Sequence, residues 1–259
     1  MDLIENLRFP RFFINGGDIK INDIVIIGGA DAKHICTVLR MKAGGKAVLC
    51  NEDGFDYPSE IVSAAGSRVE FKVLLKRAND CEPKMYLRLF QCVPKGEKLD
   101  FIVQKATELG ASEIIPVISK RCVSRPDNKN SKILRLQKIA EQAAKQSGRG
   151  KIPIVGEFTG FNAALKLYRS GNLGIIFYEN GGMRINDTVK NAVKRRPDTN
   201  YGSLSADIFV GSEGGFEPAE IAAATEAGLI PANLGRLILR AETAPIAAIS
   251  ILMNLMGEI

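Results

Sequence analysis

Residues 209–216 read FVGSEGGF and are followed at once by Glu217 and Pro218. The apolar run Ile208 to Val210 predicts a short buried strand, and Pro218 to Ala227 predicts a helix, because proline is tolerated in a first helical turn. A strand that enters a glycine-rich turn before a helix is where α/β proteins bind ligands, since glycine lets a ligand approach the main chain closely. The alternative reading of these glycines is a plain tight turn.

The spacing of these glycines excludes two common nucleotide-binding loops. No Gly-Lys-Ser/Thr follows, so the segment is not a P-loop. It also lacks the GxGxxG pattern and the acidic residue about 20 positions on that a dehydrogenase would carry. Glu213 would repel phosphate, so the loop suits a cationic or hydroxyl-bearing ligand better.

Around this loop, residues 85–259 alternate between predicted strands and helices. Two of the strands, at 174–178 and 208–210, are short buried runs, and the helices at 99–109 and 133–146 show apolar residues on one face. We expect strands at 85–91, 114–118, 174–178, 208–210 and 237–239, and helices at 99–109 (ended by Gly110), 133–146, 218–227 and 245–256. Such alternation predicts a mostly parallel sheet that is covered on both faces.

Residues 1–76 have the pattern of a small β domain. Three segments predict strands, at Ile24 to Ile27, Ala47 to Cys50 and Val69 to Val73, and glycine-rich turns separate them. One helix is expected from Ala30 to Met41, with Ile35, Val38 and Leu39 on one face. Short strands with frequent turns suggest a barrel. Residues 77–84 are polar and predict a linker, and residues 194–205 predict a mobile basic loop.

Composition limits the class of protein and its surroundings. The 259 residues include 35 Lys and Arg against 29 Asp and Glu, which gives a formal charge of +6 and favours a polyanionic partner without proving one. The five cysteines form no CxxC pair and His34 is the only histidine, so a structural zinc is not expected. The longest apolar run, Ala244 to Met253, is too short to span a bilayer, and the N-terminus lacks a signal-peptide pattern. We therefore expect a cytoplasmic chain.

A second candidate site follows the apolar segment Leu234 to Leu239. Arg240, Glu242 and Thr243 lie within four residues at the predicted mouth of the last helix. Three polar side chains after a buried strand could form a reaction site. The alternative is a helix N-cap by Thr243 beside a solvated ion pair.

Basic residues gather in several short segments and could neutralise phosphates. Aromatic residues at the N-terminus could stack on bases. The basic segments are Lys95, Lys98 and Lys105; Lys120, Arg121 and Arg125; residues 146–151; and Arg8 and Arg11 among Phe9, Phe12 and Phe13. The alternative is a set of solvated faces, with Phe12 and Phe13 in the core. For His34 an RNA-facing or structural role is favoured over catalysis.

Taken in order, these motifs resemble those of the RsmE-type 16S ribosomal RNA uracil-N3 methyltransferases of the SPOUT superfamily. The matching residues span nearly the whole chain. They are Pro10 to Phe13; His34 with Val38 to Arg40; Lys95 to Lys98; Gln104 to Gly110; Ser119 to Arg121; Gln146 to Arg149 with Pro153; Gly211 to Phe216; Leu234 and Gly235; and Leu239 to Ala244.

The resemblance implies an α/β fold of two domains. A PUA-like β-barrel at residues 1–76 would bind RNA, a linker would occupy 77–84, and a SPOUT domain with a parallel sheet and a trefoil knot would occupy 85–259. It also implies a homodimer packed through the knotted domains. The cofactor would be S-adenosylmethionine, enclosed in the knot by the Gly211 loop and the Leu234 to Leu239 segment. The partner would be 16S rRNA, within the small ribosomal subunit, and no membrane or metal is implied.

The resemblance further assigns roles to single residues. Arg240 would stabilise charge during catalysis, and Glu242 would be a base or an orienting group. Cofactor contacts are expected from Tyr178, Gly211, Glu213, Gly214, Leu234, Gly235, Leu239 and Thr243. RNA contacts are expected from Arg11, His34, Arg40, Lys98, Lys105, Arg121 and Arg149.

Two departures from the family pattern stand out, and two other functions remain open. The family usually has proline at the position of Ser212 and a basic residue at the position of Leu237, where this chain has its arginine one place earlier. The alternatives are a non-catalytic RNA-binding or ribosome-assembly module, and an enzyme of the same fold that methylates another base or a ribose.

Overall fold

Two units make up the chain in the computed structural model, which describes residues 9–125, 128–194 and 205–259. The first unit runs to Glu82 and also contains Ala144–Ile152. The second contains Pro83–Ala143 and the chain from Pro153 onward. Sequence order does not reveal that a segment from the middle of the chain belongs with the N-terminal unit. Most of the expected basic loop at 194–205 lies outside the described residues.

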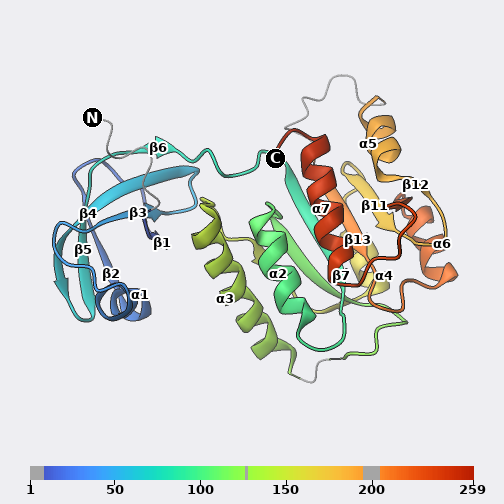
Figure 1. Cartoon of the computed structure of the whole chain (residues 1–259), viewed down its shortest axis with the longest axis horizontal. Coiled ribbons are helices and arrows are strands. Elements are labelled where there is room, and N and C mark those ends of the chain that lie inside the picture. The colour runs from blue at the N-terminus through green and yellow to red at the C-terminus, as the bar shows by residue number, and fades with distance from the viewer. Residues whose placement is uncertain (1–8, 126–127, 195–204) are drawn as a thin grey trace. The chain divides into compact units, whose positions relative to one another are not determined.

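The N-terminal unit is a curled sheet in the order β1-β3-β4-β5-β2, with β6 paired to β4 (Figure 1). Its strands are β1 (Arg11–Phe13), β2 (Ile24–Gly28), β3 (Lys46–Cys50), β4 (Phe55–Ala65), β5 (Arg68–Val73) and β6 (Arg77–Ala78). The three predicted strands are confirmed as β2, β3 and β5. Val69, Phe71 and Val73 are fully buried, as their alternation with Glu70 and Lys72 requires.

The predicted helix at Ala30 to Met41 exists only in part. Helix α1 (Gly29–Lys33) passes into a π-helical turn, η1 (His34–Val38). The wider turn changes which residues share a face, so Ile35 is buried while Val38 is 65% exposed. The expectation that Ile35 and Val38 lie on one face was therefore wrong. Beyond the turn, Arg40 adopts a left-handed conformation with φ of 52°.

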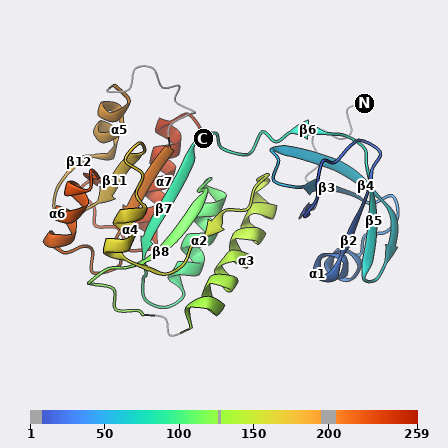
Figure 2. The same cartoon turned by 180° about the vertical axis from the view of Figure 1, so that it is seen from behind.

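The second unit is a parallel sheet in the order β10-β8-β7-β13-β11-β14-β12, with β9 paired to β8. Helices α2 and α7 lie in front of this sheet in Figure 1, and α4 lies in front of it in the reverse view of Figure 2. The strands are β7 (Tyr86–Cys92), β8 (Glu113–Ile118), β9 (Ile154–Val155), β10 (Thr159–Gly160), β11 (Leu173–Phe177), β12 (Met183–Arg184), β13 (Ser205–Val210) and β14 (Ile230–Asn233). The helices are α2 (Lys98–Glu108), α3 (Lys129–Ser147), α4 (Phe161–Leu167), α5 (Ile185–Lys194), α6 (Pro218–Glu226) and α7 (Thr243–Leu255). Helix α3 begins in this unit, and its residues from Ala144 onward belong to the first.

Most predicted elements of this unit are confirmed, but the strand at 237–239 is wrong. The last strand of the sheet is β14, which pairs with β11 and β12. Gly235 has φ of 120°, which ends the extended conformation. Leu237 and Ile238 then lie in a loop, 81% and 89% exposed, so their apolar character reflects a cavity wall rather than a strand.

The topology of the sheet marks one place where a ligand would bind. Strands β7 and β13 are neighbours, and their aromatic residues Phe90 and Phe209 stack with ring centroids 4.2 Å apart. After β7 the chain moves through α2 to β8 on one side, and after β13 it moves through α6 to β14 on the other. Ligands bind beyond the carboxyl ends of strands at such switch points. Among the described residues, no helix has the length and apolar character needed to cross a membrane.

Candidate active site

A cavity of about 650 Å³ opens at the carboxyl ends of β11, β13 and β14. Its wall is built mainly at the ends of these strands and by the segments that follow them, residues 178–180, 211–213 with Gly215, and 233–241. Lys98, the first residue of α2, lines it from the side of β7. The volume lies in the range of small-molecule sites. The sheet thus places residues from four distant parts of the chain around one cavity.

The loop after β13 is tight, and a side chain at either of two glycine positions would be crowded. A Cβ on Gly211 would lie 3.1 Å from the Cα of Gly215. Gly215 has φ of 63°, and a Cβ there would lie 2.5 Å from a carboxylate oxygen of Glu179. The Gly215 N–H donates to the Ser212 carbonyl at 2.9 Å, which closes the turn. Main chain therefore forms this side of the cavity, as the sequence indicated.

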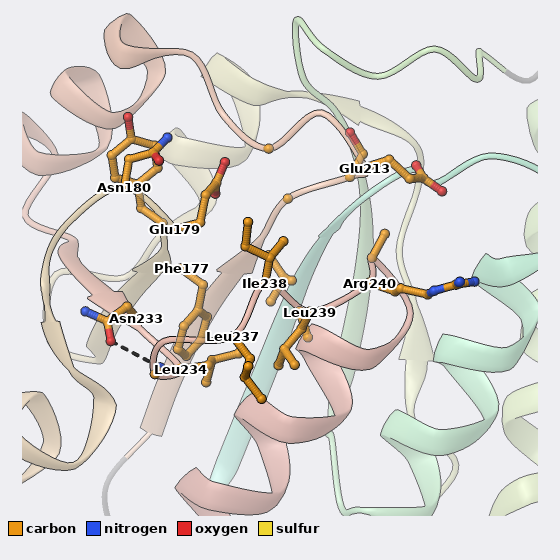
Figure 3. Close-up of a pocket in the computed structure, with 18 of the residues that line it drawn as sticks. Phe177, Glu179, Asn180, Glu213, Asn233, Leu234, Leu237, Ile238, Leu239 and Arg240 are labelled. Carbon is orange, nitrogen blue, oxygen red and sulfur yellow. Dashed lines mark hydrogen bonds between the residues drawn. The ribbon is translucent and has the colours of Figure 1, made fainter.

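The loop after β14 supplies the apolar wall. The Asn233 side chain donates to the Gly182 carbonyl at 2.9 Å and accepts from the Gly235 N–H at 3.2 Å, which fixes the start of the loop (Figure 3). Beyond Gly235, the side chains of Ile238 and Leu239 extend between the two sides of the cavity (Figure 3). This wall suits the flat apolar faces of a nucleobase or a similar ring.

Charged groups concentrate at one edge of the cavity. The ammonium of Lys98 lies 2.9 Å from Glu213 and 3.0 Å from Glu242. Glu213 also accepts the Lys95 N–H at 3.2 Å. Burial raises the pKa of Glu213, but the hydrogen bonds from Lys98 and Lys95 lower it further than burial raises it. The hydrogen bond from Lys98 lowers the pKa of Glu242 as well, so both carboxylates are charged at neutral pH.

Arg240 lies at the same edge, two residues before α7. Its carbonyl accepts the N–H groups of Thr243 and Ala244 at 2.9 and 3.0 Å, so its backbone is held in the turn that starts the helix. Its guanidinium is exposed and, among the described residues, makes no side-chain hydrogen bond or salt bridge. In Figure 3, Arg240 and Glu213 lie on one side of the cavity and Glu179 and Asn180 on the other.

Glu179 and Asn180 are cavity residues that sequence reasoning missed. They follow β11 directly, and both line the cavity. Glu179 takes part in no salt bridge within the described chain, whereas Glu213 is neutralised by Lys98. The carboxylate that is open to a cationic or hydroxyl-bearing ligand is therefore Glu179 and not Glu213. The signal was present, because Glu179 and Asn180 follow a parallel strand just as Gly211 does.

Most of the residues expected at the cofactor site line this cavity. These are Tyr178, Gly211, Glu213, Leu234, Gly235 and Leu239, together with Arg240 and Lys98. Gly214, Glu242 and Thr243 are not among the lining residues. Thr243 is the first residue of α7 and not its N-cap, which is Glu242, so the simple capping interpretation of Thr243 was wrong.

The residues expected to contact RNA fall into different environments. Arg11 forms a bidentate ion pair with Asp56, at 2.5 and 2.9 Å, and Arg149 pairs with Glu82 at 2.6 Å. Both arginine side chains are nearly inaccessible, at 9% and 3% exposure, so these contacts support the N-terminal unit rather than a nucleic-acid surface.

The other five expected RNA-contacting residues are at least partly accessible. Lys98 bridges two carboxylates at the cavity, and Lys105 pairs with Glu108 on α2. Arg121 donates to the Gly214 carbonyl at 3.1 Å and so supports the glycine-rich loop. His34 and Arg40 are exposed on the N-terminal unit. Within the described ranges, no group of three His, Cys, Asp or Glu side chains is arranged to hold a metal ion.

Comparison with known proteins agrees with the two-part architecture. The model of an RNA methyltransferase domain matches residues 81–253, and that of an RNA methyltransferase PUA domain matches residues 27–74. The chain therefore belongs to the RNA methyltransferases that join a PUA domain to a methyltransferase domain. More narrowly, it is a member of the ribosomal RNA small subunit methyltransferase E family.

Three relatives support the narrower assignment. Ribosomal RNA small subunit methyltransferase E of Bacillus subtilis is 33% identical over 226 residues, covering 86% of this chain and 87% of the relative. The protein of the same name from Buchnera aphidicola of Schizaphis graminum is 30% identical over 260 residues, covering 97% and 98%. The crystal structure of the Neisseria gonorrhoeae protein, bound to S-adenosylmethionine, superposes with a TM-score of 0.83 at 30% identity, covering 95% and 98%. The knotted SPOUT topology expected from the resemblance is consistent with these neighbours.

Proposed function

We propose that this protein transfers the methyl group of S-adenosylmethionine to N3 of a uridine in the 16S rRNA of the small ribosomal subunit. The observation that carries the proposal is the cavity at the carboxyl ends of β11, β13 and β14. Arg240 lies at its edge, and its guanidinium has no side-chain partner within residues 9–125, 128–194 and 205–259. Relatives named as small-subunit rRNA methyltransferases, one of them bound to this cofactor, support the reaction class.

The residues around the cavity fit the cofactor. Glycine backbone at Gly211 and Gly215 admits close approach, and Leu234 and Leu239 provide apolar surface for an adenine ring. Glu179 offers a carboxylate to a ribose hydroxyl or a positive charge. The bound cofactor would supply a methyl group that is already electrophilic because it is attached to a sulfonium.

The chain's own contribution to the chemistry is to make N3 of uridine nucleophilic. Neutral N3–H is a poor nucleophile, so its proton must pass to a base, directly or through water, as the methyl group moves from sulfur to N3. Loss of that proton spreads negative charge over the two neighbouring carbonyl oxygens. The unpaired guanidinium of Arg240 would stabilise that charge, which is the usual role of a preorganised cation near a reacting centre. Glu242 has a lowered pKa, which makes it a weak proton acceptor and argues against a role as general base.

We assign RNA binding to the N-terminal domain at residues 1–76, with help from the second unit. His34 and Arg40 are exposed on the first unit, and Lys105 and Arg121 are partly accessible on the second. Charge reversal at Arg40 should weaken RNA binding with a smaller dependence on salt, while cofactor affinity stays unchanged. Because 16S rRNA is made and assembled in the cytoplasm, the enzyme would work there.

A homodimer formed through the second unit would complete the assembly. Helix α7 contains no charged residue from Thr243 to Leu255, yet Ile246 and Ile251 are only half-buried. A helix that is apolar all round is normally covered on every side. We propose that a second copy of the chain packs against this face of α7. Ile246→Lys should then shift the protein from dimer to monomer, as measured by light scattering. A wild-type protein that is monomeric would contradict this.

The direct test is mass spectrometry of 16S rRNA from cells that lack the protein. We expect the loss of one N3-methyluridine, restored by the wild-type gene. Loss of a methyl group from another base or from a ribose would contradict the N3 assignment. An unchanged set of modifications, with no binding of S-adenosylmethionine in calorimetry, would favour a non-catalytic RNA-binding module.

A further inference from the structure

Lys98 joins three segments that are far apart in the sequence. It is the first residue of α2, while Glu213 lies in the loop after β13 and Glu242 immediately precedes α7. Its ammonium is 2.9 Å from the first carboxylate and 3.0 Å from the second, and all three side chains are between 21% and 33% exposed. Two carboxylates that share one cation would repel each other if that cation were removed.

Arg240, two positions before Glu242, is a second cation whose charge acts on this carboxylate. Its charge already contributes to lowering the pKa of Glu242, although the two side chains form no salt bridge. The Arg240 carbonyl accepts the N–H groups of Thr243 and Ala244, which holds its backbone, so any new partner of its guanidinium would have to be met by a change of side-chain rotamer. Glu242 therefore has two possible cationic partners, Lys98 and Arg240. In the structure its ion pair is with Lys98.

We propose that Lys98 is a positioning residue whose ion pair with Glu242 keeps the Arg240 guanidinium free to act on the substrate. The same ammonium ties the glycine-rich loop to the start of α7 through Glu213. Lys98 does not itself touch the reacting atoms. This inference rests on the proposed methyl transfer, because it assigns Arg240 its role in that reaction.

A set of four variants tests the proposal in the full-length protein. In Lys98→Met, Glu242 loses its partner and captures Arg240, so kcat should fall by about tenfold to a hundredfold with a smaller change in KM for RNA. Lys98→Arg keeps the cation and should retain most of the activity. The double variant Lys98→Met/Glu242→Gln removes the competing carboxylate as well, so its kcat should exceed that of Lys98→Met. Lys166→Met, at an exposed lysine on α4 away from the cavity, is the matched control for loss of one positive charge.

The kcat of the double variant, compared with that of Lys98→Met, shows whether Lys98 acts by keeping Glu242 away from Arg240. A double variant no more active than Lys98→Met would overturn the proposal, and so would a Lys98→Met variant with wild-type kcat. Binding of S-adenosylmethionine, measured by calorimetry for all four variants, gives a readout that needs no turnover. Lys98→Met should bind the cofactor more weakly, because the glycine-rich loop is no longer held by the ion pair between Lys98 and Glu213. An affinity equal to that of Lys166→Met would show that this ion pair does not hold the loop in its binding conformation. If wild-type protein binds cofactor but methylates no rRNA, the proposed function fails. The affinity comparison would still test whether the Lys98–Glu213 ion pair holds the glycine-rich loop.

Discussion

Strand β13 has an ion pair at each end, and the two pairs differ in burial. Near the start of the strand, Asp207 lies directly across from Arg88 on β7, and the two side chains are 0% and 4% exposed. Just past its end, Glu213 meets Lys98 with about a third of each side chain exposed. The buried pair is completely satisfied, whereas the exposed one shares its cation with Glu242. The two ends of the strand therefore differ: at the amino end the charges are fully paired and buried, and at the carboxyl end they lie at the edge of the cavity, where a ligand can meet them.

Removing the buried carboxylate should have the largest effect. Asp207 accepts two hydrogen bonds from Arg88, at 2.7 and 2.6 Å, and one each from the Asn172 side chain and the Arg169 N–H. Asp207→Ala leaves a buried guanidinium unpaired and should lower the free energy of unfolding by about 3–5 kcal/mol. Urea denaturation measures this loss.

The matched control replaces both partners at once. Arg88→Met/Asp207→Leu removes the pair without leaving an unpaired charge, so it should recover much of the stability that Asp207→Ala loses. If the double variant is as unstable as the single one, the buried ion pair has a net stabilising effect that apolar side chains cannot replace.

At the other end of the sheet, Arg240→Ala should leave stability almost unchanged and reduce turnover. The guanidinium is exposed and unpaired within the described residues, so unfolding should change by less than about 0.5 kcal/mol. The loss of transition-state stabilisation should lower kcat about a hundredfold, or about 3 kcal/mol. Single-turnover methyl transfer gives the rate, and calorimetry should show unchanged cofactor affinity. Wild-type turnover would remove Arg240 from the mechanism.

The sequence predicted the framework of this site better than its details. The strand before Gly211, the glycine-rich turn and the helix after Pro218 were all predictable, because local patterns encode them. Residues 237–239 were wrongly predicted as a strand, because an apolar cavity wall and a buried strand have the same composition. Leu237 and Ile238 are in fact exposed.

The pairing of charges could not be read from the sequence. Lys98 is separated from Glu213 by 115 positions, and Arg11 from Asp56 by 45, so only the folded chain brings them together. This is why Arg11 and Arg149 were expected on an RNA surface although both lie in buried ion pairs. Basic composition indicates a polyanionic partner but does not distinguish which cations remain free to meet it.

A smaller effect is expected at Glu179, the open carboxylate of the cavity. Glu179→Gln keeps the shape of the side chain and removes its charge, so S-adenosylmethionine should bind about tenfold more weakly, or about 1.4 kcal/mol. Glu226→Gln, at an exposed glutamate at the end of α6, is the control. Calorimetry checks both, and equal affinities for the two variants would show that Glu179 does not contact the cofactor.

The smallest effect is a pH dependence of the exposed ion pairs. The pKa values of Glu213 and Glu242 are lowered in the folded protein from the ordinary value of 4.5. Groups with a depressed folded pKa stabilise the protein above the unfolded pKa and lose that contribution as the pH falls through the folded value. The stability difference between wild type and Lys98→Met should therefore be present at pH 7 and shrink below about pH 4.5. Urea unfolding at both pH values measures it, and a difference that grows on acidification would contradict the assignment of charges.

The most direct test of the central claim is calorimetric titration of S-adenosylmethionine into the wild type and into Gly215→Leu. A leucine at this position would project into the cavity beside Glu179, where even a Cβ is too close. We predict one binding site per chain in the wild type and no detectable binding in the variant, with near-UV circular dichroism showing that the variant remains folded. Undiminished binding by the folded variant would show that the methyl donor is held somewhere else.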